Sequence, residues 1–153
     1  MALEIGRPAP GFTLQNQHGE SVSLTDIAGK QHVALVFYPF AFSGVCTGEL
    51  REVRDSSAGF ADVGATILAV SCDPMYALRV FADREGIGFA LLSDFWPHGA
   101  VSTAYGVFNE ERGCSGRATF IIDREGLLRW YVENELPQAR NIDDYRKVLA
   151  SLD

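Results

Sequence analysis

Basic residues are scarce in this sequence: 13 Lys and Arg stand against 20 Asp and Glu, so the formal net charge is −7. No basic run or patch stands out in the sequence. We therefore expect no nucleic-acid partner, because binding to phosphates needs clustered Lys and Arg. The length of 153 residues is ordinary for one compact domain, and the 47% of apolar residues is enough for a core. We expect a single domain over residues 1–153.

Long apolar runs are also missing, so no segment approaches the length of a membrane span. The first residues do not resemble a signal peptide, because Glu4 stands where a basic stretch is expected and no long apolar segment follows. From these two absences we expect a soluble, cytoplasmic protein without a membrane partner.

Cysteine is scarce as well, with only Cys46, Cys72 and Cys114, which are widely spaced and form no CxxC pair. The spacing argues against a structural zinc site, and the expected compartment argues against a disulfide framework. We therefore expect no metal and no other cofactor. A free cysteine is most often a small buried hydrophobe, so its neighbours must single out a reactive one.

The first half of the chain alternates between strand and helix patterns. A turn at His18-Gly19 predicts a small N-terminal hairpin. Continuous apolar runs predict buried strands over 32–38 and 65–71, and helical spacing predicts helices over 45–60 and 74–85.

The second half adds a short strand over 89–92, a hairpin of 118–122 with 127–132, and a closing helix over 142–152 with Asn141 as its N-cap. Strand–helix–strand units followed by an antiparallel pair predict a mixed sheet. The expected fold is α/β: a thioredoxin-like mixed sheet with flanking helices and an N-terminal β-hairpin extension.

The segment after strand 32–38 carries the reactive chemistry. Cys46 stands at the start of helix 45–60, and open α/β sheets place their sites at the carboxyl ends of strands. A cysteine reacts as its thiolate, which the N-terminus of a helix favours. Ser43 either caps the helix or offers a hydroxyl beside the sulfur. Pro39 either ends the strand or shields the sulfur from water.

The pattern Pro39-x-x-x-Ser43-x-x-Cys46 resembles the PxxxTxxC or PxxxSxxC signature of the peroxiredoxins. The likeness covers nearly the whole chain, with further matches at Gly6-x-Pro8-Ala9-Pro10-x-Phe12-x-Leu14, Leu91-Leu92-Ser93-Asp94, Ala104-Tyr105-Gly106-Val107 and Arg117-Ala118-Thr119-Phe120-Ile121-Ile122-Asp123. This resemblance implies an antioxidant thiol peroxidase on a thioredoxin fold. Its substrates would be hydrogen peroxide, organic hydroperoxides or peroxynitrite, reduced by way of a cysteine sulfenic acid.

The resemblance also implies a role for each site residue. Cys46 would attack the peroxide, Ser43 would position a peroxide oxygen, and Pro39 would shield the thiolate. Arg117 would favour the thiolate and stabilise the charge that develops as the O–O bond breaks. Glu49, one helical turn after Cys46, would orient Arg117, although a surface position is equally expected for a helix glutamate.

The positions at which many peroxiredoxins carry a resolving cysteine are empty here. Arg51 occupies one of them, helix 74–85 contains no cysteine, and none follows Cys114. This favours a one-cysteine mechanism in which an external thiol reduces the sulfenic acid. Cys72 and Cys114 leave internal resolution open, because either thiol could approach Cys46.

The residues 93–101, 106–110 and 40–46 are similar to the one-cysteine alkyl hydroperoxide reductase E subgroup. That likeness implies mycothiol with mycoredoxin, or a thioredoxin-like system, as reductant, and a homodimer or higher homo-oligomer. The candidates for such an interface, or for core packing, are Phe40, Phe42, Phe95 and Trp96. Two alternative functions stay open, a thiol-based peroxide sensor and a thiol–disulfide oxidoreductase, although Ser43 stands where a CxxC pair would begin.

Overall fold

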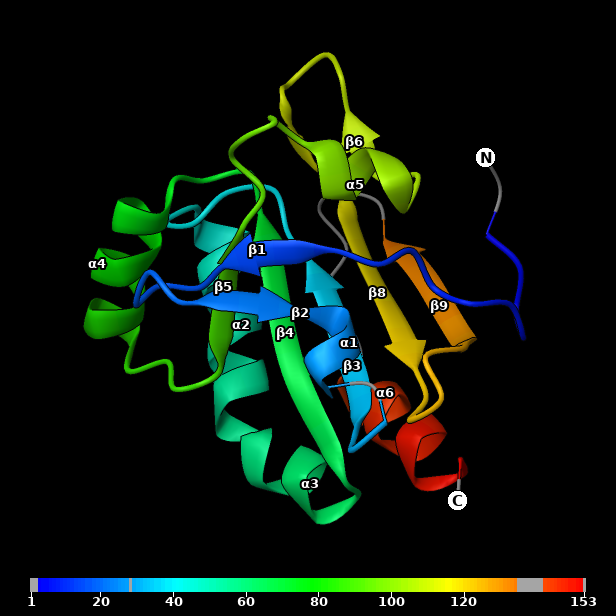
Figure 1. The fold of residues 1–153 in the computed structure, drawn as a ribbon. Coiled ribbons are helices and arrows are strands. Elements are labelled where there is room, and N and C mark those ends of the chain that lie inside the picture. The colour runs from blue at the N-terminus through cyan, green and yellow to red at the C-terminus, as the bar shows by residue number, and fades with distance from the viewer. Residues whose placement is uncertain (1–2, 28, 135–141, 153) are drawn as a thin grey trace.

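The structure is a computed structural model that describes residues 3–27, 29–134 and 142–152. A seven-stranded sheet with the order β2-β1-β5-β4-β3-β8-β9 forms its centre (Figure 1). Its strands are β1 (Thr13–Gln15), β2 (Ser21–Ser23), β3 (His32–Phe37), β4 (Ala65–Ser71), β5 (Ala90–Ser93), β8 (Arg117–Ile122) and β9 (Leu128–Asn134). A separate small hairpin joins β6 (Phe108–Asn109) and β7 (Cys114–Ser115).

Six helices surround the sheet in the described residues. They are α1 (Leu24–Ile27), α2 (Gly44–Asp55), α3 (Ser57–Asp62), α4 (Met75–Glu85), α5 (Ala100–Ala104) and α6 (Ile142–Ala150). Helix α4 ends where Gly86 adopts a left-handed conformation, which glycine tolerates without steric cost.

The sheet is mixed because β3 runs parallel to β4 and antiparallel to β8. Every residue of β3 is buried, as its continuous apolar sequence predicts for a strand covered on both faces. Side chains of alternate residues then point to opposite faces of the sheet. The predicted thioredoxin-like α/β fold and its N-terminal hairpin, in which β1 pairs with β2, are confirmed.

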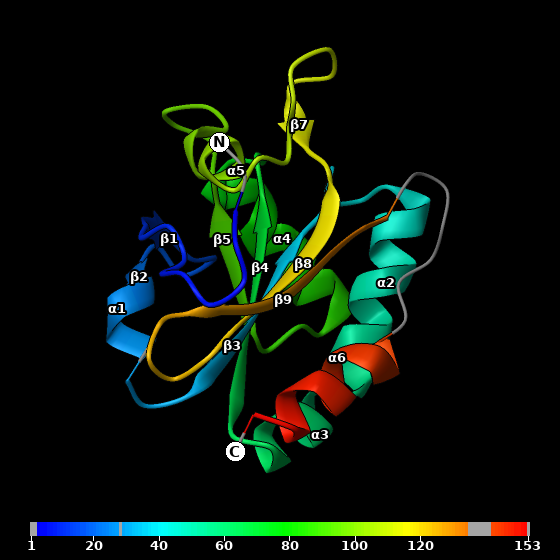
Figure 2. The ribbon, with the colours of Figure 1, turned by 90° about the vertical axis from the view of Figure 1, so that its right-hand side faces the viewer.

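Two hydrophobic layers sandwich the sheet. Leu35 and Phe37 of β3 pack on one face with Leu24 of α1 and Tyr105, which follows α5. Val36 faces the opposite side, which α2 and α4 cover, and α3 and α6 extend that layer (Figure 2). The parallel strands β3, β4 and β5 end at the same edge of the sheet, and the loop after β3 places Tyr38, Ala41 and Cys46 in the second layer.

The prediction of one helix over residues 45–60 is wrong. Helices α2 and α3 are separated at Ser56, whose backbone N–H donates to the Glu52 and Val53 carbonyls at the end of α2. Serine favours helix ends over helix interiors. The break allows α3 to direct the Phe60 side chain into the core. The short elements α1, α5, β6 and β7 were not predicted. The predicted N-cap Asn141 lies outside the described residues.

Candidate active site

The cysteine loop connects β3 to α2. It runs from Tyr38 to Ser43, and Cys46 lies in the first turn of α2 with only 1% of its surface exposed. Phe42 adopts a positive φ of 70°, which is uncommon for a residue other than glycine. Its ring meets Phe81 of α4 edge-on at 5.1 Å between centroids, and this contact holds the loop against the helix.

Arg117 reaches the cysteine from the first position of β8. Phe37 pairs with Ala118 across β3 and β8, so Arg117 lies beside the end of β3 where the cysteine loop begins. Its Nη2 donates to Cys46 Sγ at 3.4 Å, and its Nε donates to Glu49 Oε1 at 2.6 Å. The guanidinium thus links the sulfur to a carboxylate on the same helix.

A cavity of about 200 Å³ opens over Cys46, lined by Pro39, Phe40, Ser43, Gly44, Val45, Cys46, Arg112 and Arg117. Arg117 Nη1 is buried and has no hydrogen-bond partner among the residues that the structure describes. A buried donor without a partner is costly, and an oxygen atom bound in the cavity would satisfy it. The site therefore offers a sulfur and a cationic donor to one small polar group.

Ser43 occupies the N-cap position of α2, but its side chain makes no capping hydrogen bond. Its backbone carbonyl accepts from the Thr47 N–H at 2.9 Å, which starts the helix without the hydroxyl. Of the two roles predicted for Ser43, capping by the side chain is wrong. Ser43 instead lines the cavity over Cys46.

Asp73 belongs to the site, and the sequence analysis missed it. It follows the carboxyl end of β4, and its Oδ2 accepts the Ala41 N–H at 2.9 Å and the Ser71 hydroxyl at 2.7 Å. Its backbone carbonyl accepts the Ser93 hydroxyl at 2.7 Å. The Asp73 carboxylate therefore ties the cysteine loop to the end of β4, and its backbone carbonyl adds the link to the end of β5. The parallel order of β3 and β4 was the signal that could have found it.

Arg112 is the second residue missed at the site. It lies on the loop between β6 and β7, far from the cysteine loop in sequence, and its side chain is exposed. The guanidinium carbon stands 5.5 Å from the centroid of the Phe40 ring. This cation–π contact holds a positive charge at the mouth of the cavity.

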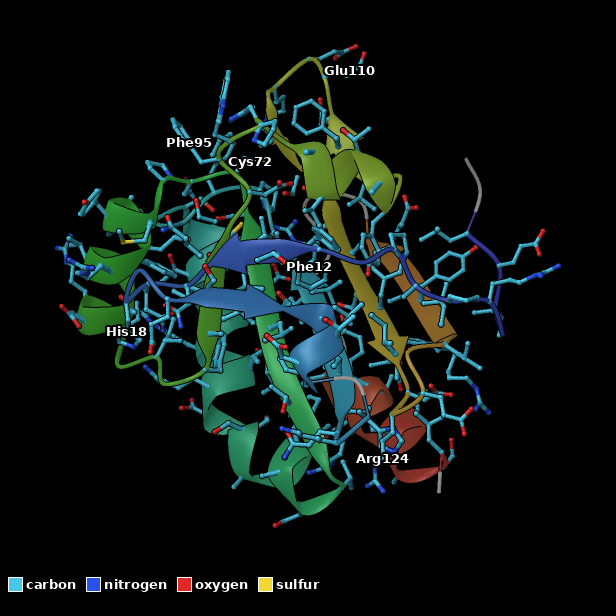
Figure 3. All side chains as sticks on the ribbon, viewed as in Figure 1. Phe12, His18, Cys72, Phe95, Glu110 and Arg124 are labelled. Carbon is cyan, nitrogen blue, oxygen red and sulfur yellow. The ribbon has the colours of Figure 1, made fainter. Side chains whose placement is uncertain are left out.

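The other two cysteines lie apart from the cavity. Cys72 and Cys114 are buried free thiols, and neither lines the cavity that holds Cys46. Cys72, at the end of β4 (Figure 3), contacts the Ser115 hydroxyl at 3.6 Å. Burial raises the pKa of the Cys72 thiol and of the Cys114 thiol. Both thiols are therefore held in the protonated, poorly nucleophilic form.

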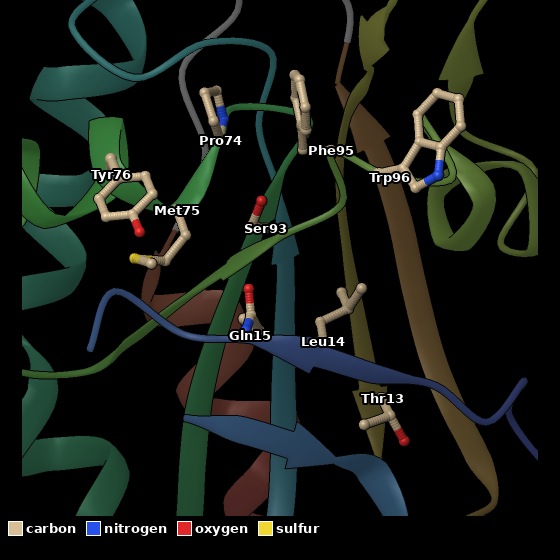
Figure 4. A pocket seen from close by; sticks show the side chains of 9 residues that line it. All are labelled: Thr13, Leu14, Gln15, Pro74, Met75, Tyr76, Ser93, Phe95 and Trp96. Atoms are coloured by element: carbon tan, nitrogen blue, oxygen red, sulfur yellow. The ribbon is translucent and has the colours of Figure 1, made fainter. Parts of the chain in front are cut away.

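Several aromatic side chains near the site face outward. Trp96 is 80% exposed, Tyr76 71%, Phe42 48% and Phe95 46%. Core packing is thus the wrong interpretation for Phe42, Phe95 and Trp96. Phe95, Trp96 and Tyr76 border a second cavity of about 500 Å³, between β1, the start of α4 and the loop after β5 (Figure 4).

Within 3–27, 29–134 and 142–152, no three His, Cys, Asp or Glu side chains are grouped so that they could hold a metal ion. In the same ranges no helix has the length and apolar character needed to cross a membrane.

Known proteins resemble this chain over most of its length. A model of the AhpC/TSA family matches residues 5–131. Alkyl hydroperoxide reductase E of Mycobacterium tuberculosis is 44% identical over 144 residues, covering 94% of this chain and 92% of that protein. Peroxiredoxin tpx1 of Schizosaccharomyces pombe is 35% identical over 159 residues, covering 97% and 81% respectively.

Solved structures agree with these sequence matches. The peroxidoxin BcpB of Mycobacterium tuberculosis superposes with a TM-score of 0.90 at 28% identity, covering 99% of both chains. The Enterococcus faecalis AhpC superposes with a TM-score of 0.89 at 30% identity, covering 98% of this chain and 93% of that one.

Proposed function

This chain belongs to the AhpC/TSA family of peroxiredoxins, which are thiol peroxidases, and from that premise we propose that Cys46 is the sulfur that reduces the peroxide. The proposed active unit is one peroxiredoxin domain over residues 1–153. The contact between Arg117 Nη2 and Cys46 Sγ at 3.4 Å is the observation that carries the proposal. A guanidinium at this distance favours the thiolate, which is the nucleophilic form.

In the proposed first step, the Cys46 thiolate attacks the terminal oxygen of the peroxide. A sulfur–oxygen bond forms while the O–O bond breaks, so the sulfur is oxidised to a sulfenic acid and the peroxide is reduced. The departing oxygen takes up a proton and leaves as water or an alcohol. Arg117 Nη1, a buried donor facing no partner in the described structure, would bind an oxygen as its charge develops.

Three neighbours support this step. The Ser43 hydroxyl is not engaged in capping α2, so it is available to position a peroxide oxygen. Pro39 is buried, offers no N–H and lines the cavity, which limits the access of water to the sulfur. Glu49 holds the guanidinium in place through its bond to Arg117 Nε.

We propose that an external thiol completes the cycle. A first thiol would condense with the sulfenic acid, releasing water and forming a mixed disulfide, and a second thiol would then free Cys46 and leave as a disulfide. The buried positions and raised pKa values of Cys72 and Cys114 support this over internal resolution. Mycothiol with mycoredoxin, or a thioredoxin-like protein, would supply the thiols in the cytoplasm, where free cysteines are maintained.

The exposed aromatic side chains support a homodimer. Phe42 exposes a large apolar surface on the cysteine loop, and Tyr76, Phe95 and Trp96 do so around the second cavity; such surfaces commonly mark interfaces between proteins. We propose that two copies of the chain associate across these loops, with Phe40 behind them at the cavity wall.

The experiment that tests the function is rapid-mixing oxidation of the purified protein by hydrogen peroxide or an organic hydroperoxide. The Cys46→Ser variant should lose the fast phase, while the matched variants Cys72→Ser and Cys114→Ser should keep it. Intact mass after one equivalent of peroxide should show the gain of one oxygen atom. If Cys46→Ser consumed peroxide at the parent rate, the proposal would be wrong. Oxidation without turnover when a thiol system is added would instead indicate a sensor.

A further inference from the structure

The charges around Cys46 do not favour an anionic substrate by themselves. The thiolate and Glu49 carry two negative charges, and Arg117, which contacts both, offsets one of them. The chain as a whole is also negative, with a formal net charge of −7. A negatively charged peroxide that approaches this site would therefore be repelled unless another cation stands nearby.

Arg112 is that cation. It lines the same cavity as Cys46 and Arg117, and unlike Arg117 it lies at the exposed side of the cavity. It forms no ion pair with any residue in the described part of the chain, and Glu111, which precedes it on the loop, is exposed and forms none there either. Glu110, on the same loop, stands at the loop tip and points away from the body of the protein (Figure 3).

The Phe40 ring fixes where this charge stands. Because the Arg112 guanidinium carbon lies 5.5 Å from the ring centroid, the side chain is held over the cavity wall. The Asn109 side chain supports the loop from below by accepting the Arg112 backbone N–H at 3.1 Å. The cation at the mouth is thus partly ordered before any substrate arrives.

The cavity has room for peroxides larger than hydrogen peroxide. Its volume is about 200 Å³, whereas a water molecule in the liquid takes up about 30 Å³. A substituent on the peroxide would fit between the reacting oxygen at Cys46 and the guanidinium at the mouth.

We propose, on the basis of the proposed peroxidase function, that Arg112 is a specificity-determining residue that selects peroxides carrying a negative charge next to the O–O bond or on a short substituent. Arg117 binds the reacting oxygens at the bottom of the cavity. Arg112 pairs with the anionic group at its mouth. In this proposal Arg117 stabilises the bond that breaks, and Arg112 recognises the rest of the substrate.

The test compares a short hydroperoxy acid with its methyl ester, which has the same peroxide group but no charge. The readout is the ratio of the two second-order rate constants for Cys46 oxidation within one variant, because the ratio cancels any general loss of activity. The parent protein should prefer the acid by about fivefold at low ionic strength. The preference should shrink as salt is added, since the Debye length falls to about 10 Å at 0.1 M salt.

Arg112→Gln should abolish the preference and Arg112→Glu should reverse it. Arg112→Lys should keep most of it, because the charge is retained, whereas Phe40→Leu should weaken it by releasing the guanidinium. Arg146→Gln is the matched control, since it removes the same charge from an exposed position on α6. It should leave the ratio at the parent value.

The outcomes separate this inference from the proposed function. A parent protein that oxidises equally fast with acid and ester, or an Arg112→Gln variant that keeps the preference, would overturn the role of Arg112 while the peroxidase function stands. If neither peroxide oxidised Cys46 in the parent protein, the proposed function itself would be wrong.

Discussion

Arg117 Nε donates to Glu49 Oε1 at 2.6 Å, and both side chains are buried. Because the same guanidinium contacts Cys46 through Nη2, Glu49 sets the position of the donor that the sulfur uses. We regard Glu49 as a positioning residue that acts through Arg117. A buried ion pair is sensitive to the removal of one partner, since the charge left behind has no compensation.

The first prediction follows from this pair. Glu49→Ala should lower the free energy of unfolding by about 3 kcal/mol and slow peroxide oxidation of Cys46 at least on the order of tenfold, because the guanidinium loses its anchor. Glu49→Gln keeps an oxygen that accepts from Nε and should recover part of the rate. Denaturant titration and rapid-mixing kinetics measure the two effects. Equal rates for Glu49→Gln and Glu49→Ala would contradict a positioning role through this hydrogen bond.

Ser43 allows catalysis to be separated from helix capping. A serine whose side chain caps a helix costs about 1 kcal/mol when it is replaced by alanine. Because the Ser43 side chain makes no capping bond, Ser43→Ala should leave the melting temperature near the parent value and yet slow peroxide oxidation. Ser43→Thr, which keeps the hydroxyl, is the control and should retain the rate. A marked drop in melting temperature without a change in rate would show that the hydroxyl serves the fold.

Asp73 yields a prediction about the loop. Asp73→Ala removes the acceptor of the Ala41 N–H and should cost about 1–3 kcal/mol, the penalty for leaving such a donor unpaired. The cysteine loop should then lose its fixed position, so oxidation of Cys46 should slow and cleavage of the loop by proteases should accelerate. Asp73→Asn, which keeps one acceptor oxygen, should show a smaller effect on both measurements. Parent-like proteolysis in Asp73→Ala would contradict the proposed tether.

The exposed aromatic surface predicts the assembly state. Trp96→Glu places a charge in the proposed interface between two copies, and a buried charge without a partner strongly disfavours association. Sedimentation analysis should therefore find the parent protein dimeric and the variant mostly monomeric at the same concentration. Tyr131→Glu, at an exposed aromatic on β9, serves as the control and should stay dimeric. A Trp96→Glu variant that still forms dimers would place the interface elsewhere.

The strands of the central sheet were predictable because a short, continuous apolar run such as 32–38 is typical of a strand buried on both faces. The break at Ser56 was not, because a serine within an otherwise helical pattern carries no strong stop signal. Helices α1 and α5 are too short for helical periodicity to show.

The candidate site was likewise predictable only in part. The position of Cys46 followed from the strand-to-helix pattern, and the family signature directed attention to Arg117. Asp73 and Arg112 were missed because each joins the site through the spatial meeting of two loops, which single-sequence patterns do not specify. Only the register of β3 with β4, and the turn of the β6–β7 hairpin, bring them within reach of the cysteine loop.

The buried cysteines give a prediction that depends on pH. Burial raises the pKa values of Cys72 and Cys114, so the thiolate of each is scarce until the pH exceeds the ordinary thiol value of about 8.5. In the Cys46→Ser variant, alkylation of native protein should be slow at pH 7 and should still be accelerating above pH 9. Unfolding in denaturant should restore the ordinary thiol titration at both positions. Peptide mass mapping assigns the label to each cysteine, and rapid labelling of native Cys72 or Cys114 at neutral pH would show an accessible, reactive thiol and reopen internal resolution of the Cys46 sulfenic acid.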